Sequence, residues 1–290
     1  RTVWLYLFGV IEAPLPASPP QGEGLYAFIA CKYFTLMKIT IIKVGGAVVE
    51  DSAQLAALLE GFKKVEGYKI LVHGGGRRAT KVAAELGIES KMVGGRRITD
   101  AAMLEVVTMV YGGLVNKNIV AQLQSLGINA IGLTGADMDV IRSHKRPLKD
   151  GVDFGFVGDV DKVNAERLKT LIDAGMTPVL APLTHDGAGT MLNTNADTIA
   201  SETARALAAL YDVTLVYCFE KPGVLANPDD DTSVIPTITR NDFNRLTADG
   251  TISGGMLPKI ENALAAVEAG VKKVVITKAD SIGKGGTVIQ

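Results

Sequence analysis

Two short apolar stretches that each run into consecutive glycines constrain the fold more than any other feature of this chain. Residues 38–46 read KITIIKVGG, and residues 69–77 read KILVHGGGR. Apolar, β-branched runs of this length predict strands buried on both faces, and the glycines predict that another group closely approaches the backbone. Ligands of open parallel sheets sit outside the carboxyl ends of the strands. The two turns therefore predict a site there, and bare N–H groups favour an anion such as phosphate.

The rest of the chain alternates predicted strands with predicted helices. Residues 99–126 have the period of one long helix, residues 140–161 suggest small antiparallel strands or a flap, and residues 89–97 form a polar link. Further strands are expected at 128–133, 177–183, 213–219 and 274–277. This alternation predicts an α/β fold, with helices on both faces of a mainly parallel sheet.

Composition excludes several classes of protein. The 290 residues are 47% hydrophobic, which suffices for one large α/β domain or two small ones. Lys and Arg total 30 against 31 Asp and Glu, so no basic field is available for nucleic acid. Two cysteines, Cys31 and Cys218, are too few for a disulfide framework or a zinc site and favour a reducing cytoplasm.

The first 36 residues differ from the rest of the chain. Their apolar run, Val3–Ile11, is about nine residues long, whereas a membrane span needs about 20, so no membrane partner is expected. Prolines at 14, 16, 19 and 20 then disfavour regular structure. We expect residues 1–36 to be a non-native or disordered extension, with the domain beginning at Met37. A targeting segment or an ordered arm is the alternative.

The glycines after the second stretch can be explained in more than one way. Residues 73–79 fit a dinucleotide-binding pattern, but no acidic residue ends a following strand, which disfavours NAD. No G-x-x-x-x-G-K-[ST] segment occurs, so a P-loop is excluded. Tight strand–helix packing and a backbone site for an anion both remain, and we favour the anion site.

Three cations stand in unusual positions. Lys43 lies inside an apolar strand, where an ammonium group is unfavourable unless it meets a negative charge. Lys259 begins a predicted helix, where the helix dipole disfavours a cation, although alone it would be read as a surface lysine. Arg97, beside a helix start, either is solvated or grips a carboxylate with two hydrogen bonds.

A predicted helix start is surrounded by three polar side chains, Asn193, Asn195 and Asp197, although capping the helix requires only one of them. One of them capping the helix, with the others idle, is the simpler explanation. The three histidines are scattered and are not read as ligands or bases. We expect His73 to satisfy backbone groups at the end of its strand.

Five segments, taken together and in this order, resemble the amino acid kinase family, most closely its branch that phosphorylates N-acetyl-L-glutamate. They are residues 42–46 (IKVGG), 72–76 (VHGGG), 96–99 (RRIT), 191–197 (MLNTNAD) and 254–259 (GGMLPK). The resemblance covers residues 37–290. It implies a three-layer α/β/α sandwich whose N-terminal lobe, about 37–187, binds the acyl-amino acid and whose C-terminal lobe, about 188–290, binds ATP. The implied reaction transfers the γ-phosphoryl group of ATP to the side-chain carboxylate, a step of arginine biosynthesis.

The resemblance also implies a role for each candidate residue. Lys43 and Lys259 would neutralise the transferred phosphoryl group, and Asp197 would hold both ammonium groups. Catalytic N–H donors would come from Gly46 and Gly75, and Gly45 would join Gly46 and the two lysines in binding the nucleotide. The acyl-amino acid would be bound by Gly75, Gly76, Arg97, Asn193 and Asn195, with Arg97 on the α-carboxylate. Mg²⁺ would be carried by the ATP phosphates and not by a metal site built from protein ligands.

Alternatives remain beside this assignment. Residues 218–220 read CFE where many relatives have leucine-threonine-aspartate, which leaves the ATP contacts there open. The same reaction on N-succinyl-L-glutamate, a sibling kinase acting on aspartate, glutamate, carbamate or UMP, and a catalytically silent amino-acid sensor are the competing functions. The family's arginine-inhibited members carry an additional N-terminal helix that builds a hexamer, and residues 1–36 are too rich in proline to supply it. The resemblance therefore implies a homodimer that is insensitive to arginine, and we expect it in the cytoplasm.

Overall fold

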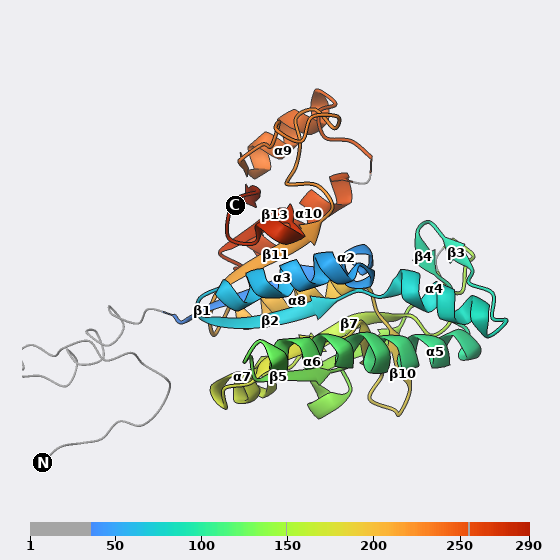
Figure 1. Cartoon of the computed structure of the whole chain (residues 1–290). Helices are drawn as coiled ribbons and strands as arrows, with labels where there is room; N and C mark the ends of the chain where they lie inside the picture. The colour runs from blue at the N-terminus through green and yellow to red at the C-terminus, as the bar shows by residue number, and fades with distance from the viewer. Residues whose placement is uncertain (1–35, 149, 255) are drawn as a thin grey trace, which may run out of the picture. The chain divides into compact units, whose positions relative to one another are not determined.

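The first predicted strand, β1 (Lys38–Val44), lies inside an eight-stranded sheet in the computed structural model (Figure 1). The structure describes residues 36–148, 150–254 and 256–290. The expectations for the extension fall almost wholly on residues outside these ranges. Residues 38–290 form one unit by themselves.

The sheet has the order β12-β14-β13-β11-β1-β2-β8-β5. Neighbouring strands run parallel, except that β13 and β14 are antiparallel. The prediction of a mainly parallel sheet is therefore confirmed. The other strands are β2 (Tyr68–His73), β5 (Ala130–Leu133), β8 (Thr177–Leu180), β11 (Asp212–Phe219), β12 (Thr237–Ile238), β13 (Lys273–Lys278) and β14 (Thr287–Ile289).

The register brings the ends of three central strands to one level. Val44 on β1 pairs with His73 on β2 and with Cys218 on β11. The residues that follow these strands consequently meet at one edge of the sheet, as the rule for parallel sheets requires.

Helices cover both faces of the sheet and make three layers (Figure 1). Side chains alternate along β1, so Ile42 and Val44 pack with Leu58 and Phe62 of α3 on one face, while α8 contacts β1 and β11. The α-helices are α2 (Gly46–Glu50), α3 (Ser52–Lys64), α4 (Gly76–Glu85), α5 (Ala101–Val107), α6 (Asn116–Ser125), α7 (Ala165–Asp173), α8 (Ala196–Leu207), α9 (Arg240–Ala248) and α10 (Met256–Glu268). Within the described ranges, no helix is both long and apolar enough to cross a bilayer.

Outside the main sheet, the structure confirms one expectation and corrects two. The expected small antiparallel strands are present: β6 (Ile141–Lys145) and β7 (Gly158–Val163) pair antiparallel in a second sheet of order β10-β9-β6-β7, which also contains β9 (Leu183–His185) and β10 (Met191–Asn193). The polar link instead holds a hairpin, β3 (Met92–Val93) with β4 (Arg96–Arg97). The long helix is interrupted between α5 and α6 by a π-helix, η1 (Thr108–Val115). Two 3₁₀ turns complete the list, η2 (Asp137–Asp139) and η3 (Ala279–Ser281).

Candidate active site

Two glycine turns meet at the carboxyl ends of β1 and β2. The Gly74 N–H donates to the Val44 carbonyl at 2.9 Å. A Cβ on Gly74 would lie 2.9 Å from the backbone nitrogen of Gly46, and a Cβ on Gly75 would lie 2.9 Å from Cδ1 of Tyr111. Both distances are shorter than real Cβ contacts, so glycine is required by packing as well as by any ligand. Tight packing and an anion site are thus compatible explanations.

The helices that follow these turns begin without a side-chain cap from any described residue. Gly45 precedes α2 and Gly75 precedes α4, and neither can supply a capping oxygen. The first N–H groups of a helix have no partner within the helix. Such groups, together with the positive end of the helix dipole, can bind an anion.

His73 fixes the second turn in the way the sequence predicted. Its Nδ1 lies 2.7 Å from the Gly74 carbonyl oxygen, which can only accept, so Nδ1 carries the proton. Its Nε2 then accepts from Nδ2 of Asn116 at 3.1 Å. Complete burial lowers the pKa of His73 to about 4, so the ring is neutral. It holds the loop and is unsuited to act as a base on substrate.

Lys43 is nearly buried and meets a carboxylate. Its Nζ lies 2.7 Å from Oδ1 of Asp197, a residue in the first turn of α8, although the angles are not those of a hydrogen bond. The side chain of Lys43 is 9% exposed. The negative charge that a lysine in an apolar strand requires is therefore supplied by the protein itself.

Lys259 is held differently from the expectation. It lies in the first turn of α10, and its Nζ is 4.0 Å from the centroid of the Phe219 ring. No ion pair joins it to Asp197 in the part of the chain that the structure describes. Lys43 Nζ lies 5.6 Å from the same centroid, so a single ring lies beside both ammonium groups. In the sequence, Phe219 stands out only as part of a departure from the family pattern.

Arg97 projects from β4 toward the start of α4 and is 9% exposed. Its Nη2 donates to the Gly76 carbonyl and to Oγ1 of Thr80, each at 2.8 Å, and its Nη1 donates to Oγ of Ser90 at 2.8 Å. These partners are all neutral, and no described carboxylate pairs with the guanidinium. A buried cation of this kind is suited to a carboxylate brought by a ligand.

Tyr111, from the π-helix, is a further residue that the sequence did not point to. Its ring packs beside Gly75. Burial raises the pKa of Tyr111, and nearby Arg97 opposes this effect, so the hydroxyl group keeps its proton. Short π-helical segments often occur at functional sites, and the helical spacing of apolar residues gave no sign of this one.

Asn195 and Asn193 have different roles in the structure. The Asn195 side chain caps α8 by accepting from the N–H groups of Asp197 and Thr198 at 2.7 and 3.2 Å. Asn193, at the end of β10, donates from Nδ2 to Oγ1 of Thr99 at 2.9 Å, two residues beyond Arg97. One cap was expected and Asn195 supplies it, while Asn193 is tied to the segment that carries Arg97.

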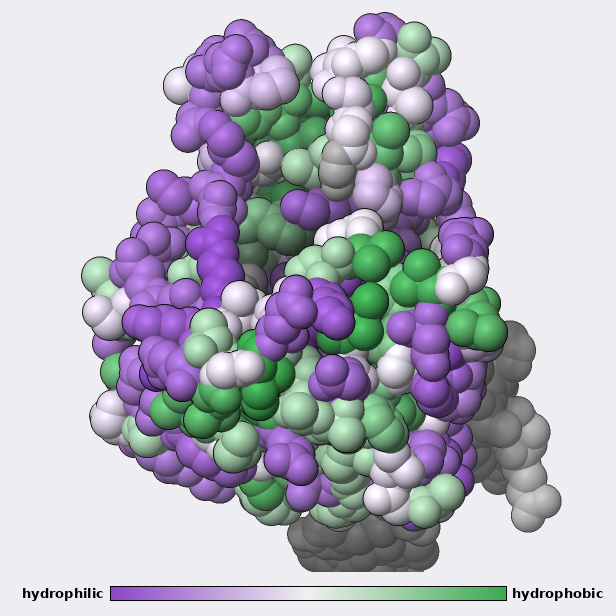
Figure 2. Space-filling model, turned by 90° about the vertical axis from the view of Figure 1, so that its right-hand side faces the viewer, coloured by the Kyte–Doolittle hydropathy of each residue, from purple (hydrophilic) through white to green (hydrophobic). Residues whose placement is uncertain are grey.

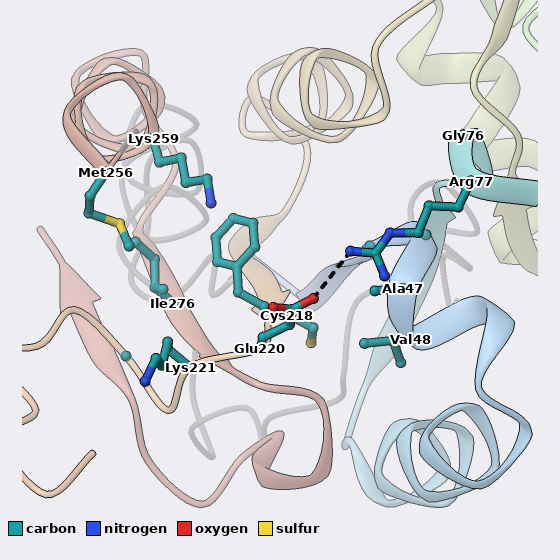
Figure 3. Close-up of a pocket in the computed structure, with 14 residues that line it drawn as sticks. Ala47, Val48, Gly76, Arg77, Cys218, Glu220, Lys221, Met256, Lys259 and Ile276 are labelled. Atoms are coloured by element: carbon teal, nitrogen blue, oxygen red, sulfur yellow. Dashed lines mark ion pairs between the residues drawn. The ribbon is translucent and has the colours of Figure 1, made fainter. Parts of the chain in front are cut away.

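A cleft of about 480 Å³ opens at these strand ends. Figure 2 shows the face toward which β1 and β2 point, and this face is hollowed in its upper part. Lys259 reaches into the cleft from α10 (Figure 3). Across the cleft, Nη2 of Arg77 lies 3.7 Å from Oε1 of Glu220 (Figure 3). The lining residues are Gly45, Gly46, Ala47, Val48, Gly76, Arg77, Cys218, Phe219, Glu220, Lys221, Gly223, Met256, Lys259 and Ile276.

The chemistry of this site fits phosphate groups better than a metal ion held directly by protein. No group of three or more His, Cys, Asp or Glu that could hold a metal occurs in the described ranges. Asp197 is engaged by Lys43, and Glu220 faces Arg77. What remains is backbone N–H groups and ammonium groups, which match phosphoryl oxygens.

The chain belongs to the amino acid kinase family, whose sequence profile matches residues 38–278. An acetylglutamate kinase of Phocaeicola vulgatus is 68% identical over 254 residues, covering 87% of this chain and 98% of the relative. An acetylglutamate kinase of Methanopyrus kandleri is 44% identical, covering 86% of this chain and 99% of the relative.

A solved structure agrees with the fold. The smu.665 protein of Streptococcus mutans superposes with a TM-score of 0.71 at 30% identity, covering 87% of this chain and 98% of its own. The amino acid kinase fold expected from the sequence is confirmed.

Proposed function

We propose that this chain transfers the γ-phosphoryl group of ATP to the γ-carboxylate of N-acetyl-L-glutamate, giving N-acetyl-L-glutamyl 5-phosphate and ADP. Relatives that this chain covers over 95–98% of their length carry the name acetylglutamate kinase, which supports the reaction and its place in arginine biosynthesis. The observation that carries the proposal is that Lys259 and glycines of both turns line one cleft, and that Lys43 lies beside the same Phe219 ring that lines it.

The reaction requires positioning and neutralisation of charge more than a base. The acceptor carboxylate is ionised at neutral pH, so no proton must be removed before one of its oxygens attacks the γ-phosphorus. The bond from that oxygen to phosphorus forms, and the bond from phosphorus to the β,γ-bridging oxygen breaks. ADP leaves with the bonding electron pair.

We assign the two lysines to the phosphoryl group in flight. Lys43 and Lys259 place two positive charges near the same ring, where negative charge moves from the acceptor oxygen to the leaving phosphate. Asp197 orients Lys43 through their 2.7 Å contact. The N–H groups at Gly45, Gly46 and Gly75 supply neutral donors along the same path, and Gly45 and Gly46 join the lysines in holding the nucleotide.

We assign the acyl-amino acid to the side of the cleft formed by Gly76, whose carbonyl accepts a hydrogen bond from Arg97. The guanidinium is already oriented by Gly76 and Thr80, so it can receive the α-carboxylate of the substrate without reorganisation. Gly75 and Gly76 would offer backbone groups, and Asn193 would act from β10 with Asn195 nearby. In this assignment residues 37–187 form the acyl-amino acid lobe and residues 188–290 the ATP lobe.

Mg²⁺ would be carried by the ATP phosphates, where it neutralises their charge. We further propose a homodimer in the cytoplasm. These three points rest on the resemblance and on composition.

The test measures ADP release with N-acetyl-L-glutamate and N-succinyl-L-glutamate in parallel, beside a reaction without acceptor. We expect ADP release that requires an N-acyl-glutamate, and the ratio of kcat/KM for the two acceptors identifies the acyl group. Aspartate, glutamate, carbamate and UMP serve as the other acceptors. No acceptor-dependent release from a well-folded protein would contradict the proposal and favour a silent sensor.

A further inference from the structure

The Phe219 ring lies beside the ammonium groups of two lysines, a position where a carboxylate would be the more usual partner. Phe219 ends β11 at the edge of the cleft and is partly exposed. Its ring stacks on that of Tyr217 with centroids 5.9 Å apart and planes 10° apart, which fixes its orientation. Lys259 Nζ lies 4.0 Å, and Lys43 Nζ 5.6 Å, from its centroid.

Lys259 needs such a partner more than Lys43 does. Lys43 comes from a central strand and already contacts Asp197. Lys259 lies in the first turn of α10, where the helix dipole opposes its charge, and no described carboxylate pairs with it. A lysine side chain has four flexible carbons, so without a contact its ammonium group would occupy many positions.

An aromatic ring holds a cation without neutralising it. The negative face of the ring attracts an ammonium group through its quadrupole and carries no net charge. A carboxylate at this position would hold Lys259 more strongly, but it would compete with the phosphoryl group and repel ATP. A neutral partner therefore keeps the charge of Lys259 available for the reaction.

We infer that Phe219 is a positioning residue for phosphoryl transfer, which orients Lys259, and to a smaller degree Lys43, through the face of its ring. This inference rests on the proposed function, because it concerns the lysines assigned to that reaction. It also gives the CFE segment a role that its departure from the family pattern left open.

The experiment compares Phe219→Leu, which removes the ring, with Phe219→Tyr, which retains it. We expect Phe219→Leu to lower kcat about three- to thirtyfold, the range that one cation–π contact spans, with KM for both substrates changed less than about twofold. Phe219→Tyr keeps the ring, so its kcat should stay within about twofold of the wild-type value. Phe243→Leu is the matched control, since Phe243 also lies beside a cation, Arg240, but on α9.

A second comparison tests whether Phe219 acts through Lys259. In the Lys259→Ala background, Phe219→Leu should lower kcat by less than about twofold, because the group that the ring orients is gone. A full additional loss in that background would overturn the inference. Thermal melts check folding, and Phe219→Ile, which suits a strand, replaces the leucine variant if that variant does not fold.

The remaining outcomes separate this inference from the proposed function. A rise in KM for ATP with unchanged kcat would make Phe219 a nucleotide contact and overturn the inference alone. Normal kcat in folded Phe219→Leu would do the same. Failure of the wild type to release ADP with any N-acyl-glutamate would overturn the proposed function, and the inference with it.

Discussion

As whole residues, Lys43 and Arg97 are 7% and 9% exposed, yet their charged groups have different partners. Lys43 meets a carboxylate of the protein, Asp197, at 2.7 Å. Arg97 meets only neutral acceptors within the described residues, namely Gly76, Thr80 and Ser90. Lys43, which contacts Asp197 and lies beside the Phe219 ring, is assigned to the phosphoryl group in transfer, whereas Arg97, which is oriented by neutral groups, is left to bind a carboxylate of the substrate. The comparison therefore predicts that the two residues act on different kinetic constants.

The largest effect is expected from Lys43→Ala. Loss of one preorganised electrostatic partner lowers kcat about a hundred- to a thousandfold, with little change in either KM. Asp197→Asn should also lower kcat, and the double variant should lose less than the sum, because the two residues act as a unit. Steady-state kinetics per folded molecule measures this. Normal turnover in folded Lys43→Ala would make the lysine purely structural.

Arg97→Lys is expected to raise KM for the N-acyl-glutamate about ten- to a hundredfold and to leave KM for ATP nearly unchanged. Lysine keeps the charge but loses the planar group that matches a carboxylate with two hydrogen bonds. Titrating each substrate at saturation of the other separates the two constants. A rise confined to KM for ATP would place Arg97 on the nucleotide side.

Gly74→Ala tests the close packing of the two glycine turns against each other. The added Cβ would lie 2.9 Å from the Gly46 nitrogen, so the turns must separate. We expect a loss of about 1–3 kcal/mol in unfolding free energy, together with a lower kcat. Gly113→Ala is the matched control, since its Cβ would meet nothing within 4 Å and its φ is not positive. Equal losses in both variants would contradict the packing argument.

The remaining expected effect is confined to stability at low pH and concerns His73, which holds the second turn. Its pKa is lowered from 6.5 to about 4 in the folded chain, so the unfolded chain takes up a proton first as the pH falls. Its contribution to stability is therefore complete above pH 6.5 and declines toward pH 4. Between pH 7 and pH 5, we expect the free energy of unfolding of His73→Gln to fall by about 2 kcal/mol less than that of the wild type. Chemical denaturation at each pH measures this difference.

How far the sequence predicts this molecule depends on the range of the interactions. β1, β2 and their glycine turns follow from local pattern, as does the cap at Asn195, because these features are encoded within a few residues. The π-helix at Tyr111 was missed because the helical spacing of apolar residues gave no sign of it. The β3–β4 hairpin was missed because its strands have only two residues each, although its turn, Gly94-Gly95 with positive φ, is a local signal. Phe219 beside two lysines could not be foreseen either, because three separate elements place those side chains together.

The resemblance to a family predicts the site residues as a set, but not how each side chain is held. It implied that Asp197 holds both lysines, and the structure instead gives Lys259 to an aromatic ring. Side-chain partners of this kind depend on the local choice at one position, here Phe219 at the end of β11. The family motifs do not include position 219, so they cannot predict this partner.

The most direct test of the contrast between the two cations is calorimetric titration of Lys43→Ala with the N-acyl-glutamate acceptor that the activity assay identifies. We expect its Kd to stay within about threefold of the wild type while kcat falls at least about a hundredfold, because Lys43 acts in the transition state and Arg97 holds the ground state. Arg97→Lys should show the reverse, with weakened binding. If Lys43→Ala instead loses binding as strongly as it loses turnover, the two cations share one role and the account is contradicted.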